Sequence, residues 1–409
     1  MDAQRSSLRP PSSARRRGWT LLIAGCLVAW SATERTGRAD PPRSPPETLR
    51  DAELTSVFFL DPERGWAVGD RGVIWRTEDG GRNWKLQESP LGCRWECVHF
   101  SDDRNGWIVG GWSTPYLHQS RGAVLRTRDG GQNWMPVPAP TMPRMKQVRF
   151  VDDRRGLAWG DSSSMYPSGV FHTADGGRSW APIPQSLGAS WQCGDLFTTI
   201  ANTAATNRSP DAAGEGRSLG DDGRFGGDSR FGGDPRLGSD ARLGSDARLA
   251  GDDGTPGVGG RPEQVGGPLR AVLADSSGRL ARVADGQLVA LEVPELNAAA
   301  VRAIRSTAPR NGWLVGRRGL VMRTDKSGLK WQPPSGTLPP LAAQFDWNAI
   351  AVVGSRIWIA GEPGSGVLHS ADEGRTWQLQ PTGQSLPLNS VCFLDENHGW
   401  AVGSLGTIL

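Results

Sequence analysis

Aspartate residues at a repeated spacing are the first candidates for chemistry in this chain. They lie in segments of the pattern Ser/Thr-x-Asp-x-Gly-x-x-Trp at residues 77–84, 127–134, 173–180 and 370–377. Carboxylates can serve acid–base or metal chemistry. Here, however, the glycine permits the positive φ of a tight turn, and the aspartate can accept hydrogen bonds from the backbone of that turn. The pattern therefore predicts a structural clamp between two strands and not a catalytic centre.

The aspartate and the tryptophan of each full copy are the residues that we expect to be structural. A fifth, worn copy at residues 324–331 has Lys326 in place of the aspartate. These five segments are called clamp turns below. The four full copies contribute Asp79, Trp84, Asp129, Trp134, Asp175, Trp180, Asp372 and Trp377.

Cysteine and histidine are few and scattered along the chain. The five histidines have no regular spacing, and the cysteines that follow the N-terminal segment do not form a metal-ligand motif. We expect buried free thiols, although disulfides stay open as an alternative, at Cys93, Cys97, Cys193 and Cys392. No metal, cofactor or catalytic residue is predicted, and we do not expect an enzyme.

Short apolar runs typical of β-strands flank each clamp turn. The first unit has such runs at residues 55–60, 65–69, 72–76 and 84–87, which gives four strands in about 40 residues. The content of 55 Gly, 30 Pro and 18 Trp also favours short strands and tight turns. The repeats therefore predict an all-β fold, a seven-bladed β-propeller of four-stranded antiparallel blades.

The last repeat is shorter than the others. It begins near Asn389 and reaches Leu409 before its outer strand. Two alternatives stay open for this blade: the segment before Thr55 supplies the missing strand and closes the ring, or the sequence is truncated.

Three segments do not fit the propeller repeat, which we place at residues 54–409. Residues 1–39 combine arginines with an apolar run too short to span a bilayer, so we expect a signal peptide and an extracytoplasmic protein. An anchor through Cys26 or an uncleaved leader is the alternative. Residues 40–53 form a Pro-rich linker. Residues 201–268 carry Gly/Asp/Arg hexapeptide repeats, and we expect a disordered insertion within blade 4.

The motifs resemble one known family. An Asp-x-x-x-Gly-Trp-x-Val-Gly segment, followed by Gly-x-x-x-Arg-Thr-x-Asp-Gly-Gly-x-x-Trp, covers residues 61–84 and is similar at residues 102–134. These motifs are similar to the Asp-box (BNR) repeat of β-propellers and to the photosystem II stability and assembly factors. The resemblance implies a non-catalytic seven-bladed propeller outside the cytoplasm that binds a client membrane protein, with arginines on the propeller making the contact.

Aromatic residues that the repeat does not require are candidates for partner binding. Trp95, Trp191 and Trp347 share one register at the start of the first strand of their units, and in a propeller that strand lines the central channel. Two long loops nearby contain Trp112, Tyr116 and Tyr166. Aromatic side chains gathered on one face suit binding to a protein or a sugar. The alternative is that the tryptophan rings fill the gaps between blades.

Arginines also recur in register, at Arg76, Arg126 and Arg323, each directly before a clamp turn. They could pair with neighbouring clamp carboxylates or form a basic band toward an acidic client. We expect pairing, with the basic band as the alternative.

The sequence therefore predicts a non-catalytic exported propeller that binds a client protein, which the family resemblance suggests is a membrane-protein complex. The net charge of only +3 argues against nucleic-acid binding, and we expect a monomer that is peripheral to the membrane at most. The alternative is a carbohydrate-binding or sialidase-like glycoside hydrolase propeller. Sialidase-like enzymes need an arginine triad, a tyrosine nucleophile and a Phe/Tyr-Arg-Ile-Pro segment, and this chain has no such segment.

Overall fold

The computed structural model describes residues 49–114, 119–138, 142–185, 188–197, 268–296 and 300–409. All of them belong to one compact unit, Arg43–Leu409. The expected signal peptide with Cys26, most of the expected linker and almost all of the expected insertion lie outside the described residues. None of the helices that the structure describes is both long enough and apolar enough to cross a membrane.

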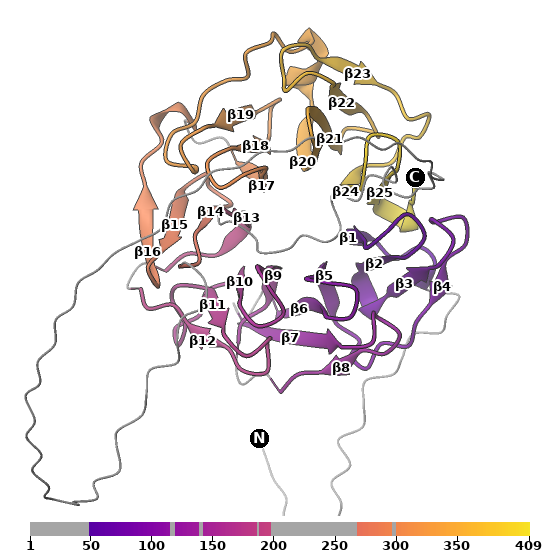
Figure 1. Ribbon diagram of the computed structural model, residues 1–409, viewed down its shortest axis with the longest axis vertical. Helices are drawn as coiled ribbons and strands as arrows, with labels where there is room; N and C mark the ends of the chain where they lie inside the picture. Colours follow the sequence, from indigo (N-terminus) through magenta and orange to yellow (C-terminus); the bar gives the residue numbers. More distant parts are fainter. Residues whose placement is uncertain (1–48, 115–118, 139–141, 186–187, 198–267, 297–299) are drawn as a thin grey trace, which may run out of the picture. The chain divides into compact units, whose positions relative to one another are not determined.

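The first three sheets follow one another along the chain and have four antiparallel strands each (Figure 1). The first contains β1 (Leu54–Phe59), β2 (Gly65–Gly69), β3 (Ile74–Thr77) and β4 (Lys85–Leu86). The second contains β5 (Arg94–Phe100), β6 (Gly106–Thr114), β7 (Gln119–Thr127) and β8 (Met135–Pro136). The third contains β9 (Met145–Phe150), β10 (Gly156–Gly160), β11 (Val170–Thr173) and β12 (Ala181–Pro182).

The next three sheets continue the series. The fourth contains β13 (Trp191–Leu196), β14 (Ala271–Asp275), β15 (Leu280–Ala284) and β16 (Gln287–Leu291). The fifth contains β17 (Val301–Ser306), β18 (Gly312–Gly316) and β19 (Val321–Thr324). The sixth contains β20 (Asp346–Val353), β21 (Arg356–Glu362), β22 (Val367–Ser370) and β23 (Gln378–Gln380).

The last sheet has only two strands, β24 (Leu388–Phe393) and β25 (Gly399–Gly403), and a single bridge between Val402 and Ile408 extends it. Short 3-10 helices connect some strands: η2 (Asp70–Gly72), η4 (Pro294–Leu296), η5 (Pro340–Gln344) and η6 (Ser404–Gly406). The all-β propeller with four-stranded antiparallel blades is therefore confirmed. Six sheets have three or four strands, so the structure shows six blades and not the seven expected, and the last sheet has two strands.

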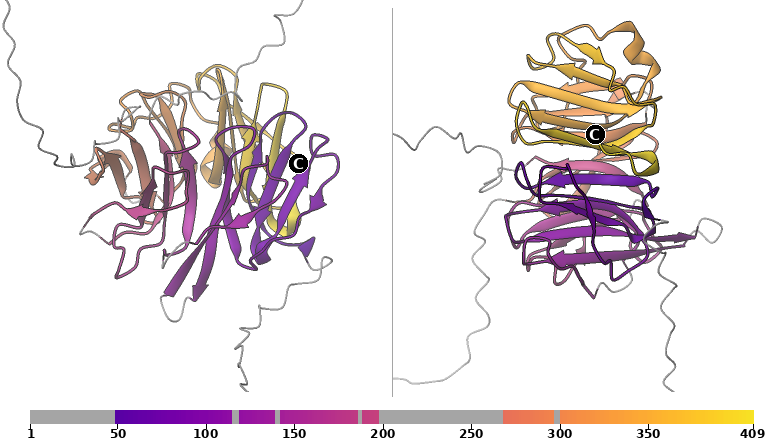
Figure 2. Two further views of the ribbon diagram at one scale, coloured as in Figure 1. Left: turned by 60° about the horizontal axis from the view of Figure 1, so that its bottom comes forward. Right: turned by 90° about the vertical axis from the view of Figure 1, so that its right-hand side faces the viewer.

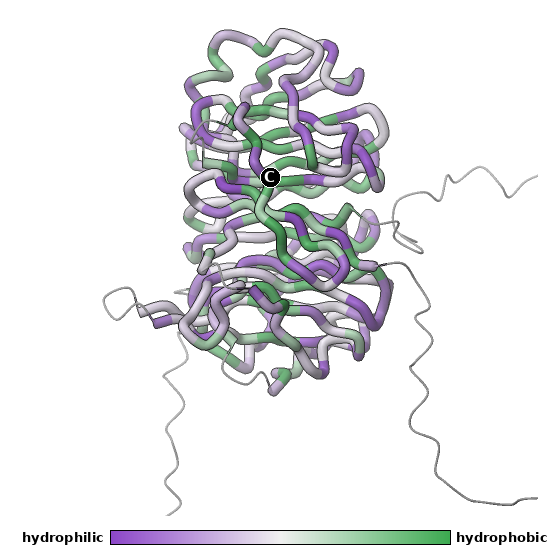
Figure 3. The backbone as a smooth tube through the Cα atoms, turned by 90° about the vertical axis from the view of Figure 1, so that its left-hand side faces the viewer, coloured by the Kyte–Doolittle hydropathy of each residue, from purple (hydrophilic) through white to green (hydrophobic). Residues whose placement is uncertain are grey.

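The first strands of the sheets lie side by side around the centre of the ring. Each contacts the next, in the order β1, β5, β9, β13, β17, β20 and β24, and β24 contacts β1 again. Figure 1 shows the last sheet beside the first. Among the described residues, none before Leu54 pairs with the last sheet. Figure 3 shows hydrophobic and hydrophilic stretches alternating along the backbone.

A β-bulge near the start of the inner strands turns polar side chains toward the neighbouring sheet. The register shifts between Leu54 and Ser56, for example, and the hydroxyl of Thr55 donates to the carbonyl of Trp95 at 2.7 Å. The amide of Asn389 likewise donates to the carbonyl of Leu54 at 2.9 Å. An inner strand is the edge of its sheet and has unpaired backbone groups there. These bonds satisfy some of those groups and join the blades.

The clamp turns join blades as well. The indole N–H of Trp400 in β25 donates to the carbonyl of Gly80 at 2.9 Å, and its ring stacks on Phe59 with centroids 3.4 Å apart. Trp66 donates in the same way to Gly131 of the next clamp turn, and Trp107 to Gly176. The tryptophan of one blade therefore rests on the clamp turn of the following blade.

Candidate functional site

The clamp aspartates are fully engaged by their own turns. Asp79 accepts hydrogen bonds from the backbone N–H of Asn83 at 2.8 Å, from its side-chain amide at 2.7 Å, and from the hydroxyl of Thr77 at 2.8 Å. The two bonds from Asn83 are the main cause that lowers the pKa of Asp79 to about 2. Asp129, Asp175 and Asp372 make equivalent bonds. These carboxylates hold turns, as the pattern predicts, and their low pKa values do not suit proton transfer near neutral pH.

The clamp tryptophans pack against aromatic rings of their own or a neighbouring sheet. Trp84 meets Phe59 edge-on, and Trp180 meets Phe150 in the same way. Trp134 and Trp377 are buried, at 6% and 7% exposure. The surroundings of all four are those of packing residues.

The expected aromatic surface at Trp95, Trp191 and Trp347 is absent because these rings are buried, at 0%, 3% and 0% exposure. Each fills the space between its own sheet and the preceding one. Trp95, for example, clusters with Trp66 and Ile74 of the first sheet. The alternative that the rings fill gaps between blades is the one that the structure shows, and the assignment of these three residues to partner binding is corrected accordingly.

The remaining aromatic candidates do not meet in one described site. Trp112 lies half-buried in β6, within the long β6–β7 hairpin that extends from the second sheet (Figure 2), and Arg121 stacks over its ring at 5.6 Å. Tyr166 is half-buried and packs edge-on against Phe171. Tyr116 lies outside the described residues. A role for Trp112, Tyr116 and Tyr166 in partner binding stays a prediction.

The arginines before the clamp turns do not pair as expected. Across the part of the chain that the structure describes, no ion pair joins Arg76, Arg126 or Arg323 to a clamp aspartate. Arg76 instead pairs with Glu78, with Nη2 and Oε1 3.0 Å apart. The reason is that the carboxylates are already occupied by their turns. Arg76 and Arg126 lie over the indoles of Trp66 and Trp107, at 5.8 and 5.7 Å.

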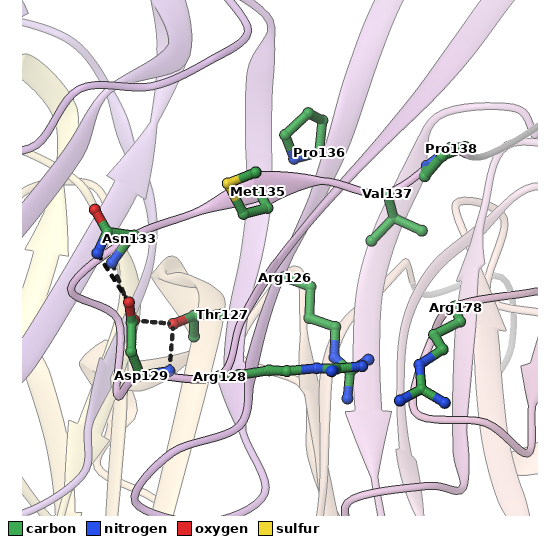
Figure 4. A pocket seen from close by; sticks show the side chains of 10 residues that line it. All are labelled: Arg126, Thr127, Arg128, Asp129, Asn133, Met135, Pro136, Val137, Pro138 and Arg178. Carbon is green, nitrogen blue, oxygen red and sulfur yellow. Dashed lines mark hydrogen bonds between the residues drawn. The ribbon is translucent and has the colours of Figure 1, made fainter.

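A pocket of about 390 Å³ brings Arg126 together with two arginines that the sequence reasoning missed, Arg128 and Arg178 (Figure 4). Arg126 is the last residue but one of β7, Arg128 lies in the clamp turn of the second sheet, and Arg178 lies in the clamp turn of the third. The pocket is called the arginine pocket below. Its other lining residues are Thr127, Asp129, Asn133, Met135, Pro136, Val137 and Pro138.

The charges of the arginine pocket are not neutralised by ion pairs between the residues that the structure describes. Burial, together with the positive charges of Arg128 and Arg178, lowers the pKa of the Arg126 guanidinium. The Nε atom of Arg126 is buried and has no hydrogen-bond partner among the described residues. Asp129 lines the pocket, but its oxygens accept bonds from Thr127 and Asn133. The pocket therefore offers several guanidinium donors to an anionic group.

Apolar side chains stand beside these charges. Met135, in the outer strand β8, is 67% exposed, and it shares the pocket wall with Pro136, Val137 and Pro138. The exposed methionine is a flexible apolar surface of the kind that adapts to peptide side chains. The pocket can thus bind a carboxylate and a neighbouring apolar group at the same time.

The residue between the threonine and the aspartate of the clamp pattern is the sequence signal for this pocket. In Thr-x-Asp, that position is Glu78 in the first sheet, Arg128 in the second and Ala174 in the third. Glu78 neutralises Arg76, whereas Arg128 adds a second positive charge beside Arg126. A comparison of the copies at this position would have distinguished the second blade from the first.

Potential metal ligands and thiols are the other groups that could do chemistry in the described part of the chain. Within the described residues, no group of three or more His, Cys, Asp or Glu side chains could hold a metal ion. Cys93, Cys97, Cys193 and Cys392 are free. Burial raises the pKa of the Cys93 thiol to about 12, so this thiol stays protonated near neutral pH.

One family model matches two separate parts of the chain. The family model described as "Photosynthesis system II assembly factor YCF48" matches residues 47–138 and 282–391. "Photosystem II assembly lipoprotein Ycf48" of Synechococcus sp. (strain CC9902) is 38% identical over 71 residues, 17% of this chain and 21% of that protein. "Photosystem II stability/assembly factor HCF136, chloroplastic" of Oryza sativa subsp. japonica is 31% identical over 86 residues, 20% of each chain. The matched part spans about a fifth of the length of these curated relatives.

A solved structure extends the similarity in fold. "YCF48 bound to D1 peptide" superposes with a TM-score of 0.56 over 88% of this chain and 92% of that chain, at 20% sequence identity. At this identity the likeness concerns the fold alone. The similarity to photosystem II assembly factors rests on the family model and the curated relatives. Together these matches identify the chain as a photosystem II assembly factor-like β-propeller.

Proposed function

We propose that this chain is a non-catalytic propeller that binds a client membrane protein, and that the arginine pocket holds an acidic, extended segment of that client. The observation that carries the proposal is the grouping of Arg126, Arg128 and Arg178 around one open pocket without an ion-paired acid among the described residues. The similar YCF48 structure has a D1 peptide bound, which supports a peptide as the ligand class.

The physical argument rests on the strength of bonds between guanidinium groups and carboxylates. Such bonds are charge-assisted, and Arg presents a planar set of donors that fits a carboxylate in two-point contact. Arg126 is already partly desolvated against Trp107, so an incoming carboxylate relieves the repulsion among three like charges. An apolar side chain next to that carboxylate would cover Met135 and Val137.

The wider proposal places this binding outside the cytoplasm. A curated relative is named a lipoprotein, which supports an exported protein, and the expected signal peptide and the Cys26 anchor remain proposals. We also propose that the two strands β24 and β25 are the inner half of a seventh blade, since β24 contacts both β20 and β1. A monomer suffices for the arginine pocket because one chain supplies all of its lining residues.

The test is peptide binding by fluorescence anisotropy with the full chain. The probe is a labelled peptide in which two glutamates flank a leucine, and its control is the same peptide with glutamine in place of glutamate. We expect Arg128→Glu to weaken binding at least about tenfold, because it would give Arg126 the acidic neighbour that Arg76 has and would remove one charge-assisted contact worth about 1.5–3 kcal/mol.

The matched control is Arg82→Glu, which makes the same change of charge at the clamp position of the first sheet that corresponds to Arg178. We expect it to leave the affinity within about twofold at 0.15 M salt, where the Debye length is about 8 Å. An equal loss of affinity in both variants would mean that net charge alone controls binding. Unchanged binding by Arg128→Glu would refute the arginine pocket as the site.

A further inference from the structure

We propose that a second, uncharged pocket on the sixth sheet binds a neutral sugar ring. The pocket measures about 250 Å³, and none of its lining residues is charged: Phe345, Ser365, Gly366, Leu379, Gln380, Pro381, Thr382 and Gln384. It differs in chemistry from the arginine pocket and lies on a different sheet. The inference goes beyond client binding and does not depend on it.

The aromatic wall of this pocket is held in place from behind. Phe345 precedes β20, and its ring lies parallel to the buried Trp347, with centroids 4.8 Å apart and an interplanar angle of 5°. Trp347 covers one face of the ring, and Phe345 lines the pocket. A Cβ atom at Gly366 would lie 2.7 Å from the ring of Phe345, so this glycine leaves the space that the ring occupies.

The polar rim of the pocket is also fixed. The hydroxyl of Ser365, a residue only 3% exposed, donates to the carbonyl of Gln384 at 2.6 Å. The same oxygen is bonded to the hydroxyl of Thr382, which is therefore the donor of that short contact. These bonds tie the β21–β22 connection to the segment after β23. A binding site whose rim is ordered before the ligand arrives loses less entropy on binding.

The two glutamine side chains complete the ligand chemistry. Gln380 and Gln384 are exposed, and their amide groups make no hydrogen bond to the residues that the structure describes. An amide both donates and accepts, and so does each hydroxyl of a sugar. An aromatic ring beside such groups can cover the apolar face of a sugar ring.

Other ligand classes fit less well. A phosphate, a carboxylate or an amine would leave its charge without an opposite charge in the pocket lining. A proline-rich peptide needs a groove lined by several aromatic rings, and this pocket has one. The volume lies just below the ~300–1,000 Å³ of pockets for drug-sized ligands, which favours one sugar ring.

The experiment is saturation-transfer difference NMR and titration of the full chain with glucose, N-acetylglucosamine and cellobiose. We expect signals on the ring protons of at least one sugar. Phe345→Leu, which keeps an apolar side chain but removes the aromatic face, should weaken that sugar roughly tenfold, the scale of one aromatic contact. Gln380→Ala combined with Gln384→Ala should weaken it by a similar factor.

Arg128→Glu is the control, because it should weaken peptide binding and leave sugar binding unchanged, while Phe345→Leu should weaken sugar binding and leave peptide binding unchanged. Failure of the client proposal and failure of this proposal are therefore distinguishable. The proposal is overturned if none of the three sugars binds at millimolar concentration, or if Phe345→Leu stays folded and binds the sugar as well as the parent chain does. A proline-rich peptide that binds in place of sugar, and depends on Phe345, would also overturn it.

Discussion

The second glycine of a clamp turn is the residue that a tryptophan of the preceding blade contacts. Gly131 has φ of 71°, and a Cβ atom there would lie 2.6 Å from the indole of Trp66. Gly177 stands in the same relation to Trp107, and Gly374 to Trp313. The glycine therefore serves two purposes, the positive φ of the turn and the close approach of the preceding blade.

We expect Gly131→Ala to lower the free energy of unfolding by about 2–5 kcal/mol. A left-handed backbone costs a non-glycine residue about 1–2 kcal/mol, and the clash with Trp66 adds about 1–3 kcal/mol of overpacking. Urea unfolding followed by circular dichroism would measure this change. The control is Gly92→Ala, because a Cβ atom at Gly92 would meet nothing within 4 Å. A similar loss in both variants would contradict the role given to the Trp66 contact.

The inner strands are the elements that hold the blades in a ring. Each is an edge strand, and side chains of the neighbouring strand bind its backbone. Asn389 of β24 donates to the carbonyl of Leu54 and to Oε1 of Glu53, at 2.9 and 3.1 Å. The hydroxyl oxygen of Ser390 accepts from the backbone N–H of Val57 at 3.3 Å. These bonds link the two-stranded last sheet to the first.

We expect Asn389→Ala to cost about 1–3 kcal/mol, because it leaves a part-buried carbonyl without its donor. Hydrogen exchange should accelerate most at the amides of β1 and β24, since the variant loosens the closure of the ring. The control is Asn397→Ala, which removes an exposed side chain whose backbone N–H alone is hydrogen-bonded. Uniform acceleration across all sheets would argue against a local role for Asn389.

The end of β13 and the start of β14 lie next to each other, although many residues separate them in the sequence. Leu196 pairs with Ala271, and the backbone N–H of Phe197 donates to the carbonyl of Arg270 at 2.8 Å. The intervening residues include the expected insertion and lie outside the described residues. The fourth sheet needs only a short connection here.

We therefore expect that replacing residues 198–267 by a short turn keeps the fold and raises the free energy of unfolding by about 2 kcal/mol. The reason is that each doubling of loop length costs about 0.6 kcal/mol. Thermal unfolding of the parent chain and the shortened chain would show this as a higher Tm, and an equal Tm would contradict it. A lower Tm would mean that the removed segment stabilises the ring.

The sequence by itself determined the features that depend only on residues close together in the chain. The clamp turn needs only residues 77–84 to form, because Thr77, Asp79 and Asn83 bond to one another and to their own backbone. Repetition of that turn with flanking apolar strands was enough to predict a propeller and the structural role of the aspartates. Local hydrogen bonds and strand periodicity carry this information within one repeat.

Only the tertiary structure decided which side chains are accessible and which charges lie together. Trp95 is the second residue of β5 and Trp191 the first of β13, and both are buried because they pack against the preceding blade. The arginine pocket needs Arg128 from one clamp turn and Arg178 from the next, while Arg76, in the same register as Arg126, is neutralised by Glu78. The physical reason is that burial and charge compensation are set by contacts between blades, which the spacing inside one repeat does not specify.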